Sequence, residues 1–198
     1  MFDRLIGVIT LKAATYRQIA DDTTATGQAL IVLVVATLIN GFFGGLVKVD
    51  TATGAVSASV VGAILGAIGA VIFGLIAWVV AAWVLQLVAG WFGGKTNTSE
   101  MMRVTGYVEV FSIVGVLSVL AFFGTALTCV VGIVGFIAAI LALIGYVIGV
   151  REAAEFSTGK AIITAIIAAI IRFLIVAVVA GAVIGAIAVA LALTGAGG

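Results

Sequence analysis

The apolar positions of this chain fall in long uncharged blocks, separated by short segments that carry nearly all of the charge. The blocks comprise 25 residues after Asp22, 44 after Asp50 and 41 after Glu109, and a fourth block from Ala161 onward contains only Arg172. A helix needs about 20 apolar residues to cross the hydrocarbon core of a bilayer, so the third block can hold two spans. The pattern predicts an all-α integral membrane protein, a bundle of five transmembrane helices at about residues 27–47, 60–90, 103–123, 129–150 and 161–192.

Polar residues inside these blocks predict two of the connections. Residues 51–59 (TATGAVSAS) are small and polar and indicate a loop, which leaves one long second span that is tilted or emerges from the membrane. The turn inside the third block is expected near Gly124, Thr125 and Thr128, its most polar point. The alternative of six spans requires the long second span to fold back on itself.

Residues 1–22 differ in character from the membrane domain at 23–198. Their apolar residues recur at steps of three or four and form one helical stripe, which Arg4, Lys12 and Arg17 avoid. This pattern is typical of an amphipathic helix that lies in the membrane interface with its basic residues near anionic headgroups. A helix packed against the protein's own loops fits the same pattern equally well.

The basic residues predict the orientation of the bundle. With five spans, seven of the nine basic residues lie on one side, Lys48 lies on the other, and Arg172 lies within a span. Cytoplasmic loops are enriched in lysine and arginine, so we expect a cytoplasmic N-terminus and an outside C-terminus. Six spans would break this partition. The same seven residues, together with one tyrosine, are candidate contacts for partners or lipid headgroups: Arg4, Lys12, Tyr16, Arg17, Lys95, Arg103, Arg151 and Lys160.

Helix-start signals agree with the predicted boundaries. Asn97 and Glu100 lie three residues apart ahead of the third span and match a capping box. Ser157 and Thr158 precede the fifth span in the same way. We therefore expect the loops around 95–103 and 151–160 to be ordered connections.

Composition excludes most kinds of chemistry. The chain is 65% hydrophobic and 9% charged, against about 25% charged residues in typical soluble domains. It has no histidine, the commonest metal ligand and general base, and its one cysteine, Cys129, excludes an internal disulfide. We therefore expect a protein that is not an enzyme and has no catalytic residues, cofactor or metal site. Its expected partners are the lipid bilayer and other membrane proteins or further copies of the chain, and not nucleic acid.

Arg172 is the costliest residue in the predicted spans, because a charge in the bilayer interior costs several kcal/mol unless it is paired or hydrated. Glu109 is the nearest acidic residue in depth, and a buried Arg172–Glu109 pair lining a polar cavity is one hypothesis. The other is that Arg172 snorkels to the interface, since the apolar segment after it is long enough to span alone. Asn40 and Gln86 also lie within spans, where single amides more often join helices than bind ligands.

Small residues four apart are frequent in the spans. Glycine lets helix backbones approach closely, and such approaches stabilise helix pairs in lipid. These pairs predict packing within the bundle, with contacts between copies as the alternative: Gly41 with Gly45, Gly62 with Gly66, Gly145 with Gly149, and Gly181 with Gly185.

Three segments together carry a family resemblance. They are MFDRLIGVITLKAATYRQIADD at the N-terminus, GGKTNTSEMMRVTGYVEV entering the third span and REAAEFSTGKAIITAII entering the fifth. With the five-span layout, nearly the whole chain resembles short prokaryotic members of the Yip (Ypt/Rab-interacting protein) family, although Val110 stands where the family usually has proline. The resemblance implies a multi-pass protein of the prokaryotic plasma (inner) membrane, with the N-terminus cytoplasmic and the C-terminus outside. Rab binding is not expected to carry over, because this chain lacks the long cytosolic region of the eukaryotic relatives.

Two hypotheses on function follow from the sequence. The first is a non-enzymatic membrane-organising scaffold or an accessory subunit of a larger membrane complex. The second is a small channel or transporter, which requires Arg172, Glu109, Asn40 and Gln86 to converge on one polar cavity.

Overall fold

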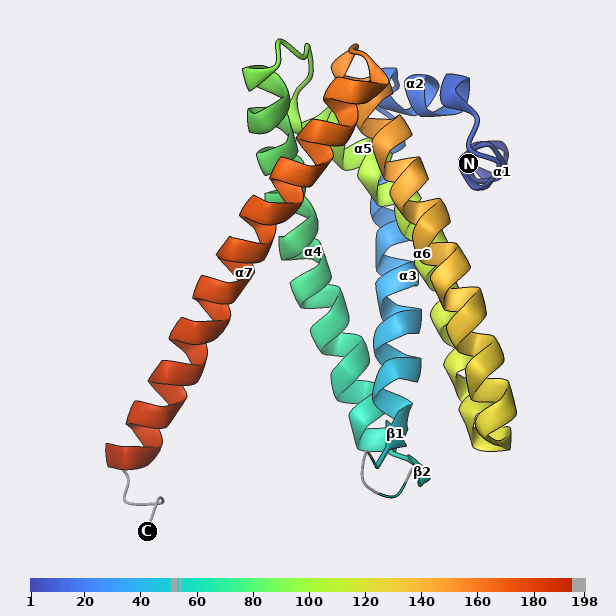
Figure 1. Cartoon of the computed structure of the whole chain (residues 1–198), viewed down its shortest axis with the longest axis vertical. Helices are drawn as coiled ribbons and strands as arrows, with labels where there is room; N and C mark the ends of the chain where they lie inside the picture. Colours follow the sequence, from blue (N-terminus) through green and yellow to red (C-terminus); the bar gives the residue numbers. More distant parts are fainter. Residues whose placement is uncertain (51–52, 54, 194–198) are drawn as a thin grey trace.

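The computed structural model describes residues 1–50, 53 and 55–193, with side-chain surroundings described for these residues except 49, 125, 176 and 179–193. Five helices within this part of the chain are long and apolar enough to cross a membrane, which confirms the predicted five-helix membrane protein. Figure 1 shows these helices meeting at the end that carries the N-terminal helices, with the last one diverging from the rest.

The N-terminal segment folds as two helices. Helix α1 (Phe2–Ile9) and helix α2 (Ala13–Asp21) are separated by a turn in which Leu11 has a positive φ of 55°. Helix α1 lies beside the end of the bundle, and α2 lies across that end (Figure 1). The break redirects the chain, so the amphipathic segment covers two sides of the bundle end.

Helices α3 (Ala25–Leu46) and α4 (Val60–Trp91) form a closely packed antiparallel pair. They are joined by a short hairpin of β1 (Val47–Val49) and β2 (Val56–Ala58), in which Lys48 pairs with Ser57. The hairpin occupies part of the expected loop, at the end of the bundle opposite α1 and α2 (Figure 1).

Glycines explain why α3 and α4 approach so closely. A Cβ atom at Gly41 would overlap the carbonyl oxygen of Gly66, and one at Gly45 would overlap that of Gly62. The same overlaps occur in reverse, so each backbone fills the space left by the missing side chain on the other. These four glycines therefore pack within the bundle.

The other predicted glycine pairs lie on the last two helices. Gly145 lies under the Tyr16 hydroxyl, and Gly149 lies against Val104. Gly181 and Gly185 lie in the part of the last helix whose surroundings are not described.

The third span combines two kinds of helix. Helix α5 (Thr98–Val108) begins with a complete capping box between Asn97 and Glu100, as predicted. At Glu109 the winding changes to a 3₁₀ helix, η1 (Glu109–Phe123), much longer than the usual three or four residues. The change begins next to Val110, and η1 packs on α3 and on helix α6 (Thr125–Ala154).

Helices α6 (Thr125–Ala154) and α7 (Thr158–Leu193) complete the bundle. The turn before α6 is at Gly124, where φ is 114°, in agreement with the predicted position. At the other end of α6, Glu155 adopts a left-handed conformation with φ of 56°, and α7 then leaves at an angle (Figure 1). Helix α7 packs on α4 and α6, and its far end diverges from the other helices (Figure 1).

The largest fully buried side chains gather near the end of the bundle that carries α1 and α2. They include Tyr16, Ile19, Leu85, Met101 and Tyr107, contributed by α2, α4 and α5. The apolar side chains of the helix shafts are instead largely exposed, as expected for surfaces that face lipid.

Candidate functional site

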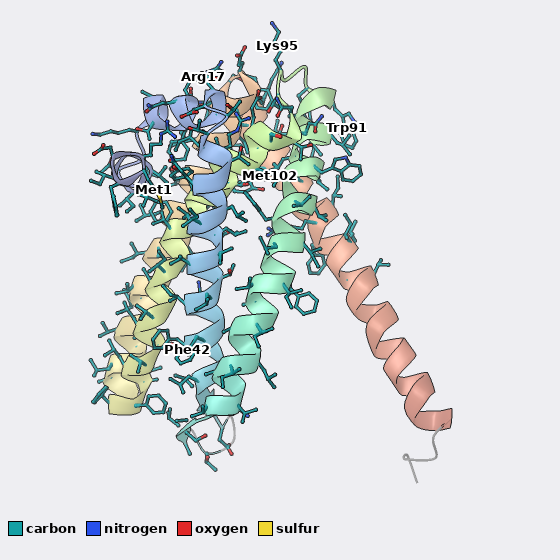
Figure 2. All side chains as sticks on the ribbon, turned by 180° about the vertical axis from the view of Figure 1, so that it is seen from behind. Met1, Arg17, Phe42, Trp91, Lys95 and Met102 are labelled. Carbon is teal, nitrogen blue, oxygen red and sulfur yellow. The ribbon has the colours of Figure 1, made fainter. Side chains whose placement is uncertain are left out.

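Two regions of the molecule carry polar chemistry. One is the charged end of the bundle, formed by α1, α2, α5, the connections 92–97 and 155–157 and the adjoining ends of α6 and α7, which we call the cap. Figure 2 shows side-chain nitrogen and oxygen atoms concentrated there, around Arg17 and Lys95. The other region is a pocket within the bundle, between α7 and the helices α6 and η1.

An ion pair between Arg4 and Asp22 ties α1 to the start of α3. The guanidinium of Arg4 donates to the Asp22 carboxylate and also to Gln28 Oε1 at 3.3 Å. Asp22 Oδ1 accepts further hydrogen bonds from the backbone N–H and the hydroxyl of Thr24, at 2.8 and 2.7 Å. The hydrogen bond from Arg4 is the main cause that lowers the pKa of Asp22 to about 2.

The lowered pKa of Asp22 predicts an acid-sensitive attachment of α1. Because the carboxylate is favoured in the folded state, its contribution to stability is present above the ordinary pKa near 3.8 and is lost as the pH falls toward 2. We expect Asp22→Asn to reduce the protection of α1 from hydrogen exchange at pH 7 and to abolish the change in protection between pH 4 and pH 2. A wild-type and a variant protein with the same pH profile would contradict this assignment.

Arg17 ties α2 to the connection between α6 and α7. Its guanidinium donates to Asp21 at 2.9 Å, to the Glu155 carboxylate at 2.6 Å and to the carbonyl oxygen of Glu152 at 2.9 Å. Arg151 is engaged in the same connection, with Glu152 at 2.6 Å and the Thr158 hydroxyl at 3.3 Å. The cap is therefore cross-linked between segments far apart in the sequence.

Two of the predicted contact residues turn inward. Arg103 is buried, donates to the carbonyl oxygen of Ala20 and reaches the Thr26 hydroxyl at 3.0 Å. Tyr16 is fully buried, and its hydroxyl donates to the carbonyl oxygen of Val8 at 3.1 Å. Both were predicted to meet partners or headgroups, and this prediction is wrong for them because their polar atoms are used to join α1, α2, α3 and α5.

The remaining basic residues of the cap differ in whether their ammonium groups have hydrogen-bond partners. Lys160 donates to the carbonyl oxygen of Phe92 at 2.9 Å, which joins the start of α7 to the end of α4. Lys12 and Lys95 are exposed, and neither ammonium group has a hydrogen bond or ion pair within the described part of the chain. These two lysines are therefore the basic groups of the cap that are free to contact lipid or a partner.

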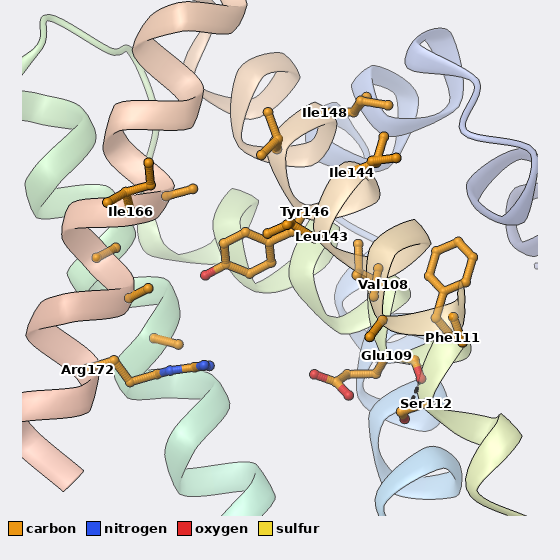
Figure 3. A pocket seen from close by; sticks show the side chains of 18 of the residues that line it. Val108, Glu109, Phe111, Ser112, Leu143, Ile144, Tyr146, Ile148, Ile166 and Arg172 are labelled. Atoms are coloured by element: carbon orange, nitrogen blue, oxygen red, sulfur yellow. Dashed lines mark hydrogen bonds between the residues drawn. The ribbon is translucent and has the colours of Figure 1, made fainter. Parts of the chain in front are cut away.

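The pocket has a volume of about 1070 Å³ and lies mainly between α7, α6 and η1. Glu109 at the start of η1 and Arg172 on α7 both line it, and Figure 3 shows their charged ends pointing toward each other across it. They form no ion pair among the residues that the structure describes. The structure therefore places both residues of the predicted pair in one cavity but does not join them by an ion pair.

Tyr146 is a pocket residue that the sequence argument missed. It lies on α6, and its hydroxyl points into the pocket toward α7, the helix that carries Arg172 (Figure 3). A tyrosine deep in an apolar span is itself a signal, because its hydroxyl needs a polar partner there.

The two amides expected within spans serve to join helices. Asn40 lines the pocket, and its amide nitrogen donates to the carbonyl oxygen of Ser112 on η1 at 2.7 Å. Gln86 lies near the cap end of α4 and accepts a hydrogen bond from the Thr98 hydroxyl at the start of α5. Because Gln86 is not among the residues that line the pocket, the four polar residues do not converge as a transport path requires.

These features define a multi-pass α-helical membrane protein with a cross-linked polar cap at one end. The sequence profile of the Yip1 domain matches residues 6–180, and the chain belongs to the Yip1 domain family. The match runs from α1 into α7, so it includes both the cap and the pocket. No match was found among curated proteins or among solved structures.

Proposed function

We propose that this protein is a non-enzymatic scaffold, or an accessory subunit of a larger membrane complex, that uses its cap to hold a partner against the membrane. In this proposal the protein resides in a prokaryotic plasma membrane with the cap cytoplasmic and the C-terminus outside. The concentration of basic residues in the cap supports that orientation.

The exposed apolar face of α1 is the observation that carries the proposal. Phe2 is 78% exposed, Ile6 58% and Ile9 48%, while the opposite face of α1 buries Val8 against the bundle. An apolar face held beside a charged cap suits the membrane interface or the apolar surface of another protein. Because Arg4 and Tyr16 hold α1 in place, the face is presented at a fixed position.

The architecture of the cap supports a role in holding a partner in place rather than in transporting a solute. Its hydrogen bonds join α1, α2, α5 and the α6–α7 connection, so a force that acts on α1 is transmitted to several spans. The free ammonium groups of Lys12 and Lys95 add positive charge to the same end, which favours anionic lipids or an acidic partner surface. Transport is not proposed, because Gln86 is separate from the pocket and Asn40 is engaged in joining α3 to η1.

We expect the double substitution Phe2→Ser and Ile6→Ser to release the partner, because it removes the exposed apolar face of α1 without touching a buried side chain. The measurement is the mass and composition of the particle obtained after gentle solubilisation of the membranes. A matched control is Phe73→Ser with Ile76→Ser on α4, where the exposed fractions are 72% and 57%. Loss of companions in the α1 variant but not in the α4 variant supports the proposal. Retention in both would exclude α1 as the contact.

A further inference from the structure

The pocket brings opposite charges face to face without joining them. Glu109 and Arg172 point toward each other from η1 and α7, and the Tyr146 hydroxyl points from α6 into the same pocket, toward α7 (Figure 3). Within the described part of the chain, the polar ends of Arg172 and Tyr146 make no hydrogen bond or ion pair. The lining of the cavity therefore presents an unpaired guanidinium, a carboxylate and a hydroxyl.

The surroundings of these groups are apolar. The lining includes Val108, Phe111, Leu143 and Ile166, and the helices that form it are spans. A charge at such a depth costs several kcal/mol unless a polar partner reaches it. The complementary occupant has an anion for Arg172, a cation for Glu109 and an apolar body for the walls.

A membrane lipid with a zwitterionic headgroup meets these three conditions. Its phosphate matches the guanidinium fork, which binds phosphate oxygens in a bidentate manner. A primary ammonium group donates hydrogen bonds to a carboxylate, whereas a quaternary ammonium group has no N–H to donate. Because α7 diverges from α6 and η1, the pocket lies between spans, where acyl chains are the surrounding solvent.

We propose that this pocket is a binding site for one phospholipid of the phosphatidylethanolamine type. Arg172 holds the phosphate, Glu109 accepts from the ammonium group, and the Tyr146 hydroxyl donates to a phosphate or ester oxygen. The acyl chains lie along the apolar walls. The site is separate from the cap, so it goes beyond the scaffold function and does not depend on it.

The competing arrangement is a direct ion pair, formed when α7 moves onto η1 and closes the pocket. Exchanging the two charges by Glu109→Arg with Arg172→Glu distinguishes the direct ion pair from the bound phospholipid. A direct ion pair can still form after the exchange. A phospholipid is expected to lose its binding after the exchange. Its phosphate is attached to the glycerol and its ammonium group is at the free end, so the order of its charges is fixed.

The test uses the full chain reconstituted in vesicles with equal amounts of phosphatidylethanolamine, phosphatidylcholine and phosphatidylglycerol. Native mass spectrometry after mild solubilisation then counts the lipids retained. We expect the wild-type protein to retain one phosphatidylethanolamine, with roughly tenfold preference over the other two, and Arg172→Gln to lower that retention by roughly tenfold. Lys48→Gln, on the hairpin outside the pocket, is the control that removes the same charge and should retain the lipid.

Three results would overturn the proposal: equal retention of the three lipids, equal retention by wild type and Arg172→Gln, or wild-type retention by the charge-exchanged variant. If Arg172→Gln does not fold, Tyr146→Phe keeps the pocket walls and removes one donor. In that case we expect a several-fold weaker preference for phosphatidylethanolamine, and an unchanged preference together with unchanged retention would count against the site.

Discussion

Substituting Gly45 with alanine is expected to lower the free energy of unfolding by about 1–3 kcal/mol, even though alanine favours helix over glycine. A Cβ atom at this position overlaps the backbone oxygen of Gly62, and a backbone cannot rotate away as a side chain can. The α3–α4 pair is among the most extensive packing contacts of the bundle, so displacing it affects the hairpin and both spans. The measurement is thermal or denaturant unfolding in detergent micelles.

The neighbouring glycine provides the control for this experiment. A Cβ atom at Gly44 would meet nothing within 4 Å, so Gly44→Ala should be neutral or slightly stabilising. Combining Gly45→Ala with Gly62→Ala should cost less than the sum of the two, because the first substitution already separates the helices. Equal stabilities of Gly45→Ala and Gly44→Ala would show that the two helices do not meet at this glycine.

The second large effect is expected for Arg103→Met, which keeps most of the apolar stem and removes the guanidinium. The loss leaves the carbonyl oxygen of Ala20 without its charged donor in a buried position, and it breaks the hydrogen bond to Thr26. Hydrogen bonds to charged groups contribute about 1.5–3 kcal/mol each. We therefore expect unfolding at clearly lower temperature, with increased hydrogen exchange in α2 and at the start of α3.

Lys12→Met is the control for Arg103→Met. Lys12 is exposed and has no side-chain partner among the described residues, so its substitution should change stability by less than about 0.5 kcal/mol. If Arg103→Met behaves like Lys12→Met, the arginine does not join α5 to α2.

The order of the spans was predictable because each apolar block is longer than a hydrocarbon core and each polar break is short. Gly124 was located as a turn from the polar residues around it, and the capping box at Asn97 was located from its spacing. The division of the N-terminal segment at Leu11 was not predictable. The apolar stripe continues through it, and the turn depends on how α1 and α2 pack against the bundle.

The polar residues were harder to assign than the spans. An arginine near a membrane boundary has the same sequence pattern whether it faces headgroups or, like Arg103, the protein interior. Glu109 and Arg172 were placed at similar depth by counting residues, and they do line one pocket. The divergence of α7 cannot be derived from such a count, because it depends on the left-handed conformation of Glu155 and the contacts of the first turns of α7.

In the proposed function, this Yip1-family protein acts by holding other molecules. The most direct test is to solubilise native membranes gently, measure the mass of the particle that contains this chain and identify its companions by mass spectrometry. The proposed function predicts a discrete particle in which defined partners, or further copies of the chain, occur in fixed proportion and depend on the α1 face. A particle that contains a single copy of this chain and only lipid would contradict it.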